Sequence, residues 1–477
     1  MSLPWFDIFV ASYFVWVVAA CLTLLGERRS PTATLAWIFA FIALPVVSGL
    51  YYMVFGPRRM DRKRLRYDRA RRALRRAREA EQGHEKPSLE PDAAGLANVA
   101  RRLEQGEPLF AASAQLLDNG DEYLAALDAA IASATHHVHM EYYIWEADAT
   151  GARVRDALLA AAQRGVEVRV IYDDVGSSAT KRAFWQGLRD AGGQVRAFNR
   201  VRLAVASIHF ANFRTHRKIA IVDGATGFLG GMNIHDAISP ARSGKAAWRD
   251  QHVRIVGEPV HRLQRVFLES WNYCRGGALR LTANNVEKYF PLTAHGSGTA
   301  MQVIASGPDD PSAPLHAFFL AALSTARSRV LLQTPYLIPD EPLETALRIA
   351  VLRGVDVQVI VPRRGDSRIV TAASHTYCES MRRVGVKVYQ YGPPMLHAKT
   401  LVIDETVGIV GTANMDNRSF RLNFEIAAAF YDRRLVARLV KRFEEDREAS
   451  RPFPARRRPE RLTALLESVA RLTSPVL

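Results

Sequence analysis

One polar pattern occurs twice in the chain with the same spacing, His-x-Lys-x4-Asp-x6-Gly-x2-Asn. Its polar members are His216, Lys218, Asp223 and Asn233 in the first copy and His397, Lys399, Asp404 and Asn414 in the second. A chance match at so many fixed positions is already rare, and two matches at one spacing have no credible accidental origin. The chain therefore carries two copies of one candidate site.

The residue types in each copy suit a phosphate group. In both copies the histidine and the lysine are two residues apart, so in a strand both side chains project from one face. The lysine supplies positive charge, the asparagine supplies a neutral donor, and the histidine can attack phosphorus or carry a proton. Two copies brought together would supply two histidines, the number needed for a nucleophile and a separate general acid.

Each motif stands at the end of a longer repeat of helices and strands. The expected pieces are a helix at 123–134, a strand around Tyr143 and a strand at 166–172, then a helix at 315–326, a strand around Tyr336 and a strand at 355–361. The strings AAAQRGVEVRVIYDD and IAVLRGVDVQVIVPR correspond closely, because each ends a helix at Gly and continues with β-branched residues. This alternation predicts layered α/β domains. We expect two similar α/β domains, at 92–290 and 291–450, packed on each other.

Two uncharged apolar runs precede the repeats, at 8–25 and 33–55. A helix rises about 1.5 Å per residue, so each run can cross a hydrocarbon core about 30 Å thick. No Lys or Arg precedes the first run, which argues against a cleaved signal peptide. The sequence therefore predicts a transmembrane hairpin over residues 1–57.

Most of the net charge follows directly after these runs. The chain has 64 Lys and Arg against 48 Asp and Glu, a net charge of +16. Twelve basic residues and two acidic ones lie between Arg58 and Arg78, so this stretch supplies +10 and leaves +6 for the rest. The positive-inside bias places the stretch and all that follows in the cytoplasm, and we treat 58–91 as a basic juxtamembrane segment and linker. No nucleic-acid partner is expected, because the remaining charge is small and no basic groove interleaved with aromatic residues is evident outside this stretch.

A tail at 451–477 combines arginine and proline with an amphipathic pattern. Five apolar side chains fall on one face of the expected helix: Leu462, Leu465, Leu466, Val469 and Leu472. This face either packs on the body of the protein or rests on a membrane surface.

The two motifs resemble the paired HKD motifs of the phospholipase D superfamily, and the order of parts resembles that of bacterial cardiolipin synthases. The resemblance is carried by RRSPTATLAWIFAFIALPVVSG in the apolar region, THRKIAIVDG, GGMNI and WRDQHVRI in the first copy, and LHAKTLVID, GTANMDNRSF and RLNFEI in the second. It spans almost the whole chain and implies two phospholipase D-like α/β domains with the active site between them. It also implies a multi-pass protein of the bacterial inner membrane with cytoplasmic catalytic domains.

The resemblance further implies a double displacement. One histidine attacks the phosphodiester of phosphatidylglycerol to give a phosphohistidine, while the other protonates the departing glycerol. The second histidine then acts as base on the hydroxyl of another phosphatidylglycerol, which takes the phosphatidyl group and becomes cardiolipin. By analogy we assign His216 as nucleophile and His397 as acid, although the symmetry of the motifs leaves this assignment open.

The other roles also follow from the resemblance. The residues expected to hold the non-bridging oxygens are Lys218, Lys399, Asn233 and Asn414. Asp250 in WRD and Glu425 in NFE match the acidic residue that pairs with each family histidine. Asp223 and Asp404 complete the two motifs and are grouped with the catalytic residues, although in the family they look more structural than chemical.

No metal and no cofactor is expected, because the site already provides cations and acid–base groups. Arg418 and Ser419, in NRSF, either line the site or form ordinary polar contacts. A membrane-anchored phospholipase D or nuclease that uses water as acceptor stays open as an alternative. A non-catalytic scaffold does not, because it would not need both motifs intact. The acceptor lipid and the oligomeric state are not determined by the sequence.

Overall fold

The computed structural model describes residues 5–26, 31–55, 74, 87–201, 212–274, 279–282, 284–292, 298–455 and 460–474. The chain forms two compact units, residues 1–60 with 201–212, and residues 61–200 with 213–477. The expected basic segment at 58–78 lies outside the described residues apart from Leu74.

The described residues of the first unit form helices α1 (Trp5–Leu25), α2 (Pro31–Ala43) and α3 (Pro45–Phe55). Residues 7–25 of α1 are long and apolar enough to cross a membrane, and no other helix in the described part of the chain meets that test. The α1 and α2 helices pack together, with the rings of Trp16 and Phe41 at 5.3 Å.

The single helix expected over 33–55 is wrong, because the structure breaks this run at Leu44. The Leu44 N–H still donates to the carbonyl of Ala40 at 2.9 Å, as the last bond of α2 requires. Pro45 has no N–H to continue that ladder, and its fixed φ suits the first position of a new helix. The helix therefore restarts as α3.

The second unit is built on a 15-stranded sheet. In spatial order its strands are β17 (Ser450–Pro452), β12 (Lys387–Tyr391), β11 (Asp356–Pro362), β9 (Arg329–Gln333), β13 (Thr400–Ile403), β14 (Val407–Gly411), β16 (Glu425–Phe430), β8 (Thr299–Ser306), β1 (Leu109–Leu117), β7 (His252–Gly257), β6 (Thr226–Gly230), β5 (Lys218–Val222), β2 (His137–Tyr142), β3 (Glu167–Asp173) and β4 (Gln194–Phe198). A separate parallel pair joins β10 (Leu337–Ile338) to β15 (Met415–Asp416).

The repeat seen in the sequence reappears in the order of the strands. From the centre outward, the first half runs β1-β7-β6-β5-β2-β3-β4 and the second runs β8-β16-β14-β13-β9-β11-β12. In each half the last three strands are parallel, and β1 and β8 pair antiparallel at the centre. The fold is therefore mixed α/β with one large sheet that both halves share. Because both halves lie in one compact unit, domain boundaries at 92–290 and 291–450 stay a prediction.

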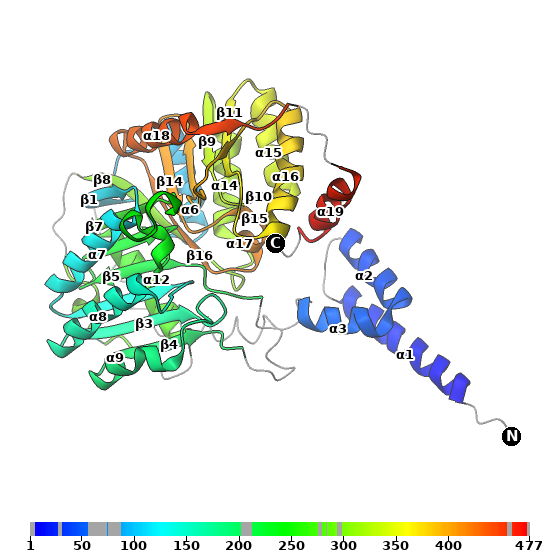
Figure 1. Cartoon of the computed structure of the whole chain (residues 1–477), viewed down its shortest axis with the longest axis horizontal. Helices are drawn as coiled ribbons and strands as arrows, with labels where there is room; N and C mark the ends of the chain where they lie inside the picture. The colour runs from blue at the N-terminus through cyan, green and yellow to red at the C-terminus, as the bar shows by residue number, and fades with distance from the viewer. Residues whose placement is uncertain are drawn as a thin grey trace. The chain divides into compact units, whose positions relative to one another are not determined.

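Helices cover the sheet on both faces. The second unit has α6 (Pro91–Arg102), α7 (Gly120–Ser133), α8 (Ala149–Gln163), η1 (Arg182–Trp185), α9 (Gln186–Asp190), η2 (Asp236–Ile238), α11 (Pro240–Ser243), η3 (Gly244–Ala246), α12 (Pro259–Tyr273), α13 (Val286–Tyr289), α14 (Pro314–Thr325), α15 (Glu341–Leu352), α16 (Arg368–Arg383), α17 (Asn417–Arg421), α18 (Arg433–Glu448) and α19 (Arg461–Leu472). In Figure 1 the first half runs from cyan to green and the second from yellow-green to red-orange.

The core follows from the alternation of side chains along buried strands. Ile219 and Ile221 of β5 belong to the cluster that also contains Phe267 of α12 and Phe443 of α18. The intervening Ala220 faces a different cluster, formed with α7 and α8. Helices α12 and α18 therefore belong to one central core that both halves share.

Candidate active site

The two predicted histidines line one cavity of about 490 Å³. Asn233 and Asn414, the predicted phosphate ligands, line the same cavity. His216 stands just before β5 and His397 just before β13, so the corresponding strand of each half delivers one imidazole. The structure thus brings together two side-chain sets that lie about 180 residues apart in sequence.

Each histidine is paired with a carboxylate from the other half. His216 Nδ1 lies 2.9 Å from Glu425 Oε1, and His397 Nδ1 lies 2.6 Å from Asp250 Oδ2. A carboxylate at Nδ1 holds the proton on that nitrogen and leaves Nε2 with a free lone pair. Each motif histidine therefore depends on the other half for the carboxylate that orients it.

Backbone hydrogen bonds also join each histidine to the half that supplies its carboxylate. The His216 N–H donates to the carbonyl of Phe424 at 2.9 Å, and the His397 N–H donates to the carbonyl of Arg249 at 2.7 Å. Since Phe424 precedes Glu425 and Arg249 precedes Asp250, each carboxylate is held in register with the histidine that it orients.

The two carboxylates are held differently. Glu425 accepts hydrogen bonds from Thr412 Oγ1 and from Asn423 Nδ2, the latter at 3.2 Å. Asp250 accepts from the backbone N–H of Gln251 at 2.7 Å. Gly231 stands in the first motif where Thr412 stands in the second, and a Cβ there would lie 2.0 Å from Asp250 Oδ1. Glycine is therefore required beside Asp250.

The two lysines are buried next to the histidines. Lys218 Nζ donates to the carbonyl of His216 at 2.7 Å, and Lys399 Nζ donates in the same way to the carbonyl of His397. Burial, with the charge of the neighbouring Lys399, lowers the pKa of Lys218 to about 7. Burial lowers the pKa of Lys399 to about 8, against the attraction of Asp250 and Glu425. Two cations so close together are poised to accept an anion between them.

The histidines are neutral in this cavity near pH 7. Burial lowers the pKa of His216 to about 4 and that of His397 to about 4, although each has a carboxylate partner. Burial alone would raise the pKa values of Asp250 and Glu425, but their histidines and the lysines hold both below the usual range. A neutral imidazole is the form that can act as a nucleophile.

Asp223 and Asp404 of the two motifs are not among the residues that line this cavity, and neither are the buried Lys218 and Lys399. The Asp223 carboxylate accepts from the backbone N–H groups of His136 and His137 at 2.8 Å. Asp404 accepts in the same way from the N–H groups at the start of β9, with Ser328 at 2.7 Å. Both aspartates have a left-handed backbone, with φ of 54° and 52°, in the turns after β5 and β13. They fix strands relative to one another.

Three aromatic side chains of the cavity were not predicted as site residues. The ring of Tyr143 lies 5.1 Å from that of His216, and the ring of Trp248 lies 5.1 Å from that of His397. The Tyr336 hydroxyl donates to Asp366, which also lines the cavity, at 2.7 Å. Trp248 stands two residues before Asp250 in the WRD string, and this position was the only sequence signal that could have placed Trp248 in the site.

The NRSF string contributes to the site in two ways. Arg418 lines the cavity beside Asn414. Ser419 Oγ accepts a hydrogen bond from the backbone N–H of Asn414 at 3.0 Å, and so positions the asparagine. Asp416 caps α17 by accepting from the N–H of Ser419, and it also accepts from Asn414 Nδ2 at 3.1 Å. This short helix therefore forms part of the cavity wall.

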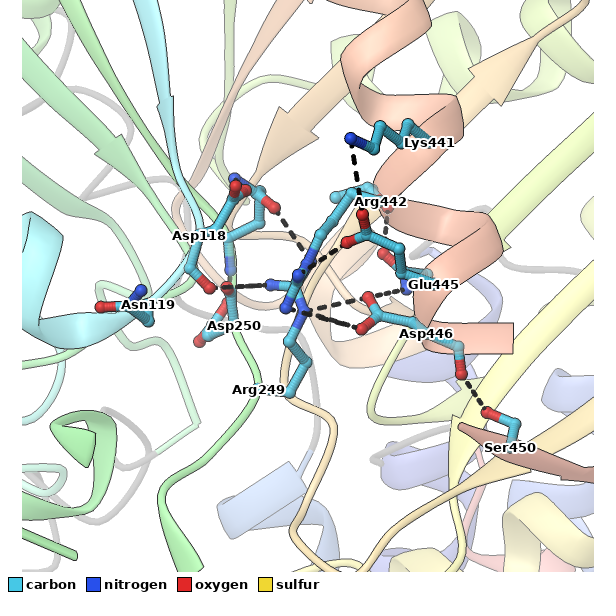
Figure 2. A network of polar contacts seen from close by, with 12 residues as sticks. Asp118, Asn119, Arg249, Asp250, Lys441, Arg442, Glu445, Asp446 and Ser450 are labelled. Carbon is cyan, nitrogen blue, oxygen red and sulfur yellow. Dashed lines mark hydrogen bonds and ion pairs between the residues drawn. The ribbon is translucent and has the colours of Figure 1, made fainter. Parts of the chain in front are cut away.

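A buried ion pair lies directly behind Asp250. Figure 2 shows Arg249 between Asp118 and Asp446 of α18, and Arg249 Nε lies 2.9 Å from Asp446 Oδ2. Gln333 Nε2 donates to the same carboxylate oxygen at 2.8 Å. Because the Arg249 carbonyl also accepts from the His397 N–H, this pair ties α18 to the backbone that carries the second histidine.

Among the described residues, no group of three or more His, Cys, Asp or Glu side chains is arranged to hold a metal ion.

Comparison with known proteins agrees with this geometry. A family model described as "Cardiolipin synthase, PLD-like domain" matches residues 127–240 and 319–447, one segment in each half. Cardiolipin synthase 1 of Bacillus cereus is 34% identical, covering 98% of this chain and 93% of the relative. The major cardiolipin synthase ClsA of Bacillus subtilis is 34% identical, covering 99% of each.

The fold is also found in a solved structure. The crystal structure of phosphatidylserine synthase from Haemophilus influenzae matches 79% of this chain and 100% of its own, with a TM-score of 0.59 at 15% identity. Two motif copies on one sheet, a shared cavity and relatives matched over almost their full length identify the family. The chain belongs to the cardiolipin synthases of the phospholipase D superfamily, which are phosphatidyltransferases.

Proposed function

We propose that this chain makes cardiolipin and glycerol from two molecules of phosphatidylglycerol. The observation that carries the proposal is the pair of histidines in one cavity, each oriented by a carboxylate from the other half. Such a site can split one displacement at phosphorus into two, each assisted by a proton transfer. The names of the relatives agree with this product.

In the first step, His216 Nε2 attacks the phosphorus of one phosphatidylglycerol. A P–N bond forms, the P–O bond to the headgroup glycerol breaks, and His397 gives its proton to the departing oxygen. Burial lowers the pKa of His397 to about 4, so the bound phosphate must raise this pKa before the imidazole can act as acid. The anionic diester does this by adding negative charge next to the imidazole.

In the second step, the neutral His397 accepts the proton of a headgroup hydroxyl on a second phosphatidylglycerol. That oxygen attacks phosphorus, the P–N bond to His216 breaks, and cardiolipin leaves. Lys218, Lys399, Asn233 and Asn414 bind the non-bridging oxygens throughout.

The aromatic lining favours a lipid alcohol over water as acceptor. Tyr143, Trp248 and Tyr336 present apolar ring surface in the cavity. Hydrolysis would use the same catalytic residues and release phosphatidic acid, so the product decides between the two reactions.

The N-terminal helices are proposed to form a membrane hairpin. The α1 helix exposes apolar side chains such as Phe9, Phe14 and Leu22, each at least 66% exposed. Residues 31–55 would return across the membrane with a bend at Leu44, because the 13 residues of α2 and the 11 of α3 together measure about 36 Å along their axes. The basic segment 58–78 would then hold the catalytic unit on the cytoplasmic side of the bacterial inner membrane.

The reaction is tested with the purified full chain in vesicles of headgroup-labelled and acyl-labelled phosphatidylglycerol, with and without EDTA. We expect cardiolipin and free glycerol in equal amounts, with no effect of chelation. Phosphatidic acid as the main product would contradict the synthase proposal and favour hydrolysis.

The orientation is tested separately by cysteine labelling in intact cells. A Lys441→Cys variant, whose side chain is 80% exposed on α18, should react with an impermeant maleimide only after the cells are opened. Labelling of intact cells would contradict the cytoplasmic placement.

A further inference from the structure

The C-terminal helix α19 packs on the catalytic unit with its polar side. Glu467 Oε1 lies 3.7 Å from His375 Nδ1 of α16, and the Arg471 guanidinium lies 4.9 Å from the centre of the Tyr377 ring. The Asn417 side chain of α17 donates to the carbonyl of Ser474 at 3.1 Å. The buried residues of this segment are Glu467, Ala470 and Ser474. They define the face that contacts α16 and α17.

The opposite face of α19 is apolar and open. Its exposed side chains are Leu462 at 67%, Leu465 at 60%, Leu466 at 58%, Val469 at 51% and Leu472 at 80%. Surface helices of globular proteins normally bury this stripe and expose the polar one. Here the arrangement is reversed, so the apolar stripe is left for another occupant.

The charge beside the stripe favours a lipid surface as that occupant. The chain next to the stripe is basic, with Arg451 exposed on β17 and four further arginines at 456–458 and 461 in the sequence. Arginines beside an apolar helical face are the composition that binds the interface of an anionic bilayer. A second protein copy would meet the same positive charge on its own surface, which disfavours self-association.

The position of α19 also links it to the reaction. Asn417, which holds the end of α19, lies between Asp416 and Arg418, and both of these line the catalytic cavity. A bilayer in contact with α19 would therefore lie next to the cavity wall that contains Asp416 and Arg418. This places the lipids close to the cavity that they must enter.

We propose that the apolar face of α19 inserts into the surface of an anionic bilayer and holds the cavity against the lipids that it uses. The proposal rests on the proposed function for the identity of those lipids. The docking itself is measured without turnover, so the docking proposal and the proposed function can fail independently.

The direct test places a fluorescent probe on the apolar face of the full chain. A Leu466→Cys variant carries an NBD label in a Cys21→Ser background, where the remaining thiols of Cys274 and Cys378 are buried. A Thr463→Cys variant labels the same helix outside the apolar stripe and serves as the matched control. The protein is reconstituted in phosphatidylglycerol vesicles that contain lipids with doxyl groups on their acyl chains.

We expect doxyl lipids to quench the probe at position 466 at least threefold more than the probe at position 463. Equal quenching at both positions, or none at either, would overturn the proposal. A blue-shifted emission at position 466 without lipid quenching would also overturn it, because the stripe would then pack on protein, either the chain's own N-terminal helices or a second copy.

A second test asks whether docking serves turnover. A Leu465→Asp/Val469→Asp variant places two charges on the stripe, and a Thr463→Asp/Ser468→Asp variant places the same charges beside it. Substrate is offered either in vesicles or as soluble short-chain phosphatidylglycerol. The stripe variant should lose at least fivefold in rate on vesicles and keep its rate on soluble substrate, while the control keeps both.

Equal losses on both substrates would contradict a docking role and indicate damage to the fold. If the unaltered chain makes no cardiolipin from either substrate, the proposed function fails, while lipid quenching still decides whether α19 docks.

Discussion

At the scale of single residues, the site depends on groups that burial has moved away from their ordinary protonation states. Two neutral histidines with pKa values of about 4 line the cavity, and two lysines with pKa values of about 7 and 8 are buried next to them. An anionic phosphate reverses both effects, because it favours the charged form of each group. Substrate binding and activation of the site are thus one electrostatic event.

The lysines predict a pH dependence of binding. The folded pKa values of Lys218 and Lys399 both lie below the ordinary value of 10.5. The free site therefore loses the charge of Lys218 as pH rises through about 7 and the charge of Lys399 as pH rises through about 8. The KM for phosphatidylglycerol should therefore rise above pH 7. Steady-state kinetics in mixed micelles between pH 6 and 9.5 measure this.

A Lys218→Arg variant provides the control, because a guanidinium stays charged over this range. Its KM should rise less with pH, whatever its absolute rate. A KM for the unaltered chain that stays constant up to pH 9.5 would mean that the lysines are not the groups that bind the phosphate.

A second residue-scale prediction concerns the exchanged carboxylates. Glu425→Gln should lower kcat by about 10² to 10⁴, since the amide no longer favours the imidazolium or the correct tautomer of His216. Combining it with His216→Ala should cost little more than His216→Ala alone. Rates of cardiolipin formation for the two single variants and the double variant measure this coupling, and full additivity of the losses would show that the pair does not act as a unit.

At the scale of secondary-structure elements, α18 is connected to the second histidine through the buried pair of Arg249 and Asp446. Asp446→Asn leaves Arg249 as an unpaired buried charge and should cost about 3–5 kcal/mol of stability. An Arg249→Met/Asp446→Leu variant removes both charges and should recover most of the thermal midpoint. Its kcat should stay at least tenfold low with KM unchanged, because the bonds that hold the Asp250 region are gone.

Glu445→Gln, on the same helix turn but 44% exposed, serves as the control and should change neither stability nor kcat. Full recovery of kcat in the double variant would show that the pair only stabilises the fold and does not position Asp250.

Local elements were predictable from the sequence because their signals are local. The strands expected at 166–172 and 355–361 correspond to β3 and β11 within one residue at each end. Glycine at the helix end followed by β-branched residues was sufficient in both cases. The break at Leu44 was not predicted, because apolarity alone does not show whether a proline kinks a helix or restarts it.

The exchange of carboxylates between the halves was not predictable from spacing. Asp250 follows the first motif and Glu425 the second, so sequence order suggests that each serves its own half. The pairing is decided by parallel bridges between the halves, which join Thr215 to Phe424 and Arg249 to Leu396. Such contacts depend on how the halves meet and leave no local pattern.

At the scale of the whole molecule, the shared sheet makes the active site depend on the union of both halves. β1 and β8 pair at the centre, and α12 and α18 contribute to the same core cluster. The sequence indicated a duplication, but a repeat does not show whether two copies form separate sheets or one. Loss of either half should therefore unfold the part of the active site that the other half supplies.

Buried histidines make the whole catalytic unit sensitive to acid. Burial lowers the pKa of His252 to about 3, against an ordinary value of 6.5. Between those values the unfolded chain binds the proton and the folded chain does not, so stability falls as pH drops below 6.5. His252 alone should cost about 2 kcal/mol between pH 7 and pH 5.

Thermal midpoints of the detergent-solubilised chain between pH 7 and 5 test this prediction. A His252→Asn variant should show a shallower fall with pH, even if its midpoint at pH 7 is lower. An unchanged slope would mean that other groups account for the acid sensitivity.

The central claim is that one phosphorus atom is attacked by one histidine while the other histidine moves the proton. Rapid alkaline quenching of the full chain with phosphatidylglycerol labelled at its phosphorus, followed by peptide mapping, tests it most directly. We predict a phosphatidyl group on His216 that forms before cardiolipin appears and disappears as it accumulates. Cardiolipin formed with no protein-bound phosphatidyl group at any time would contradict the account.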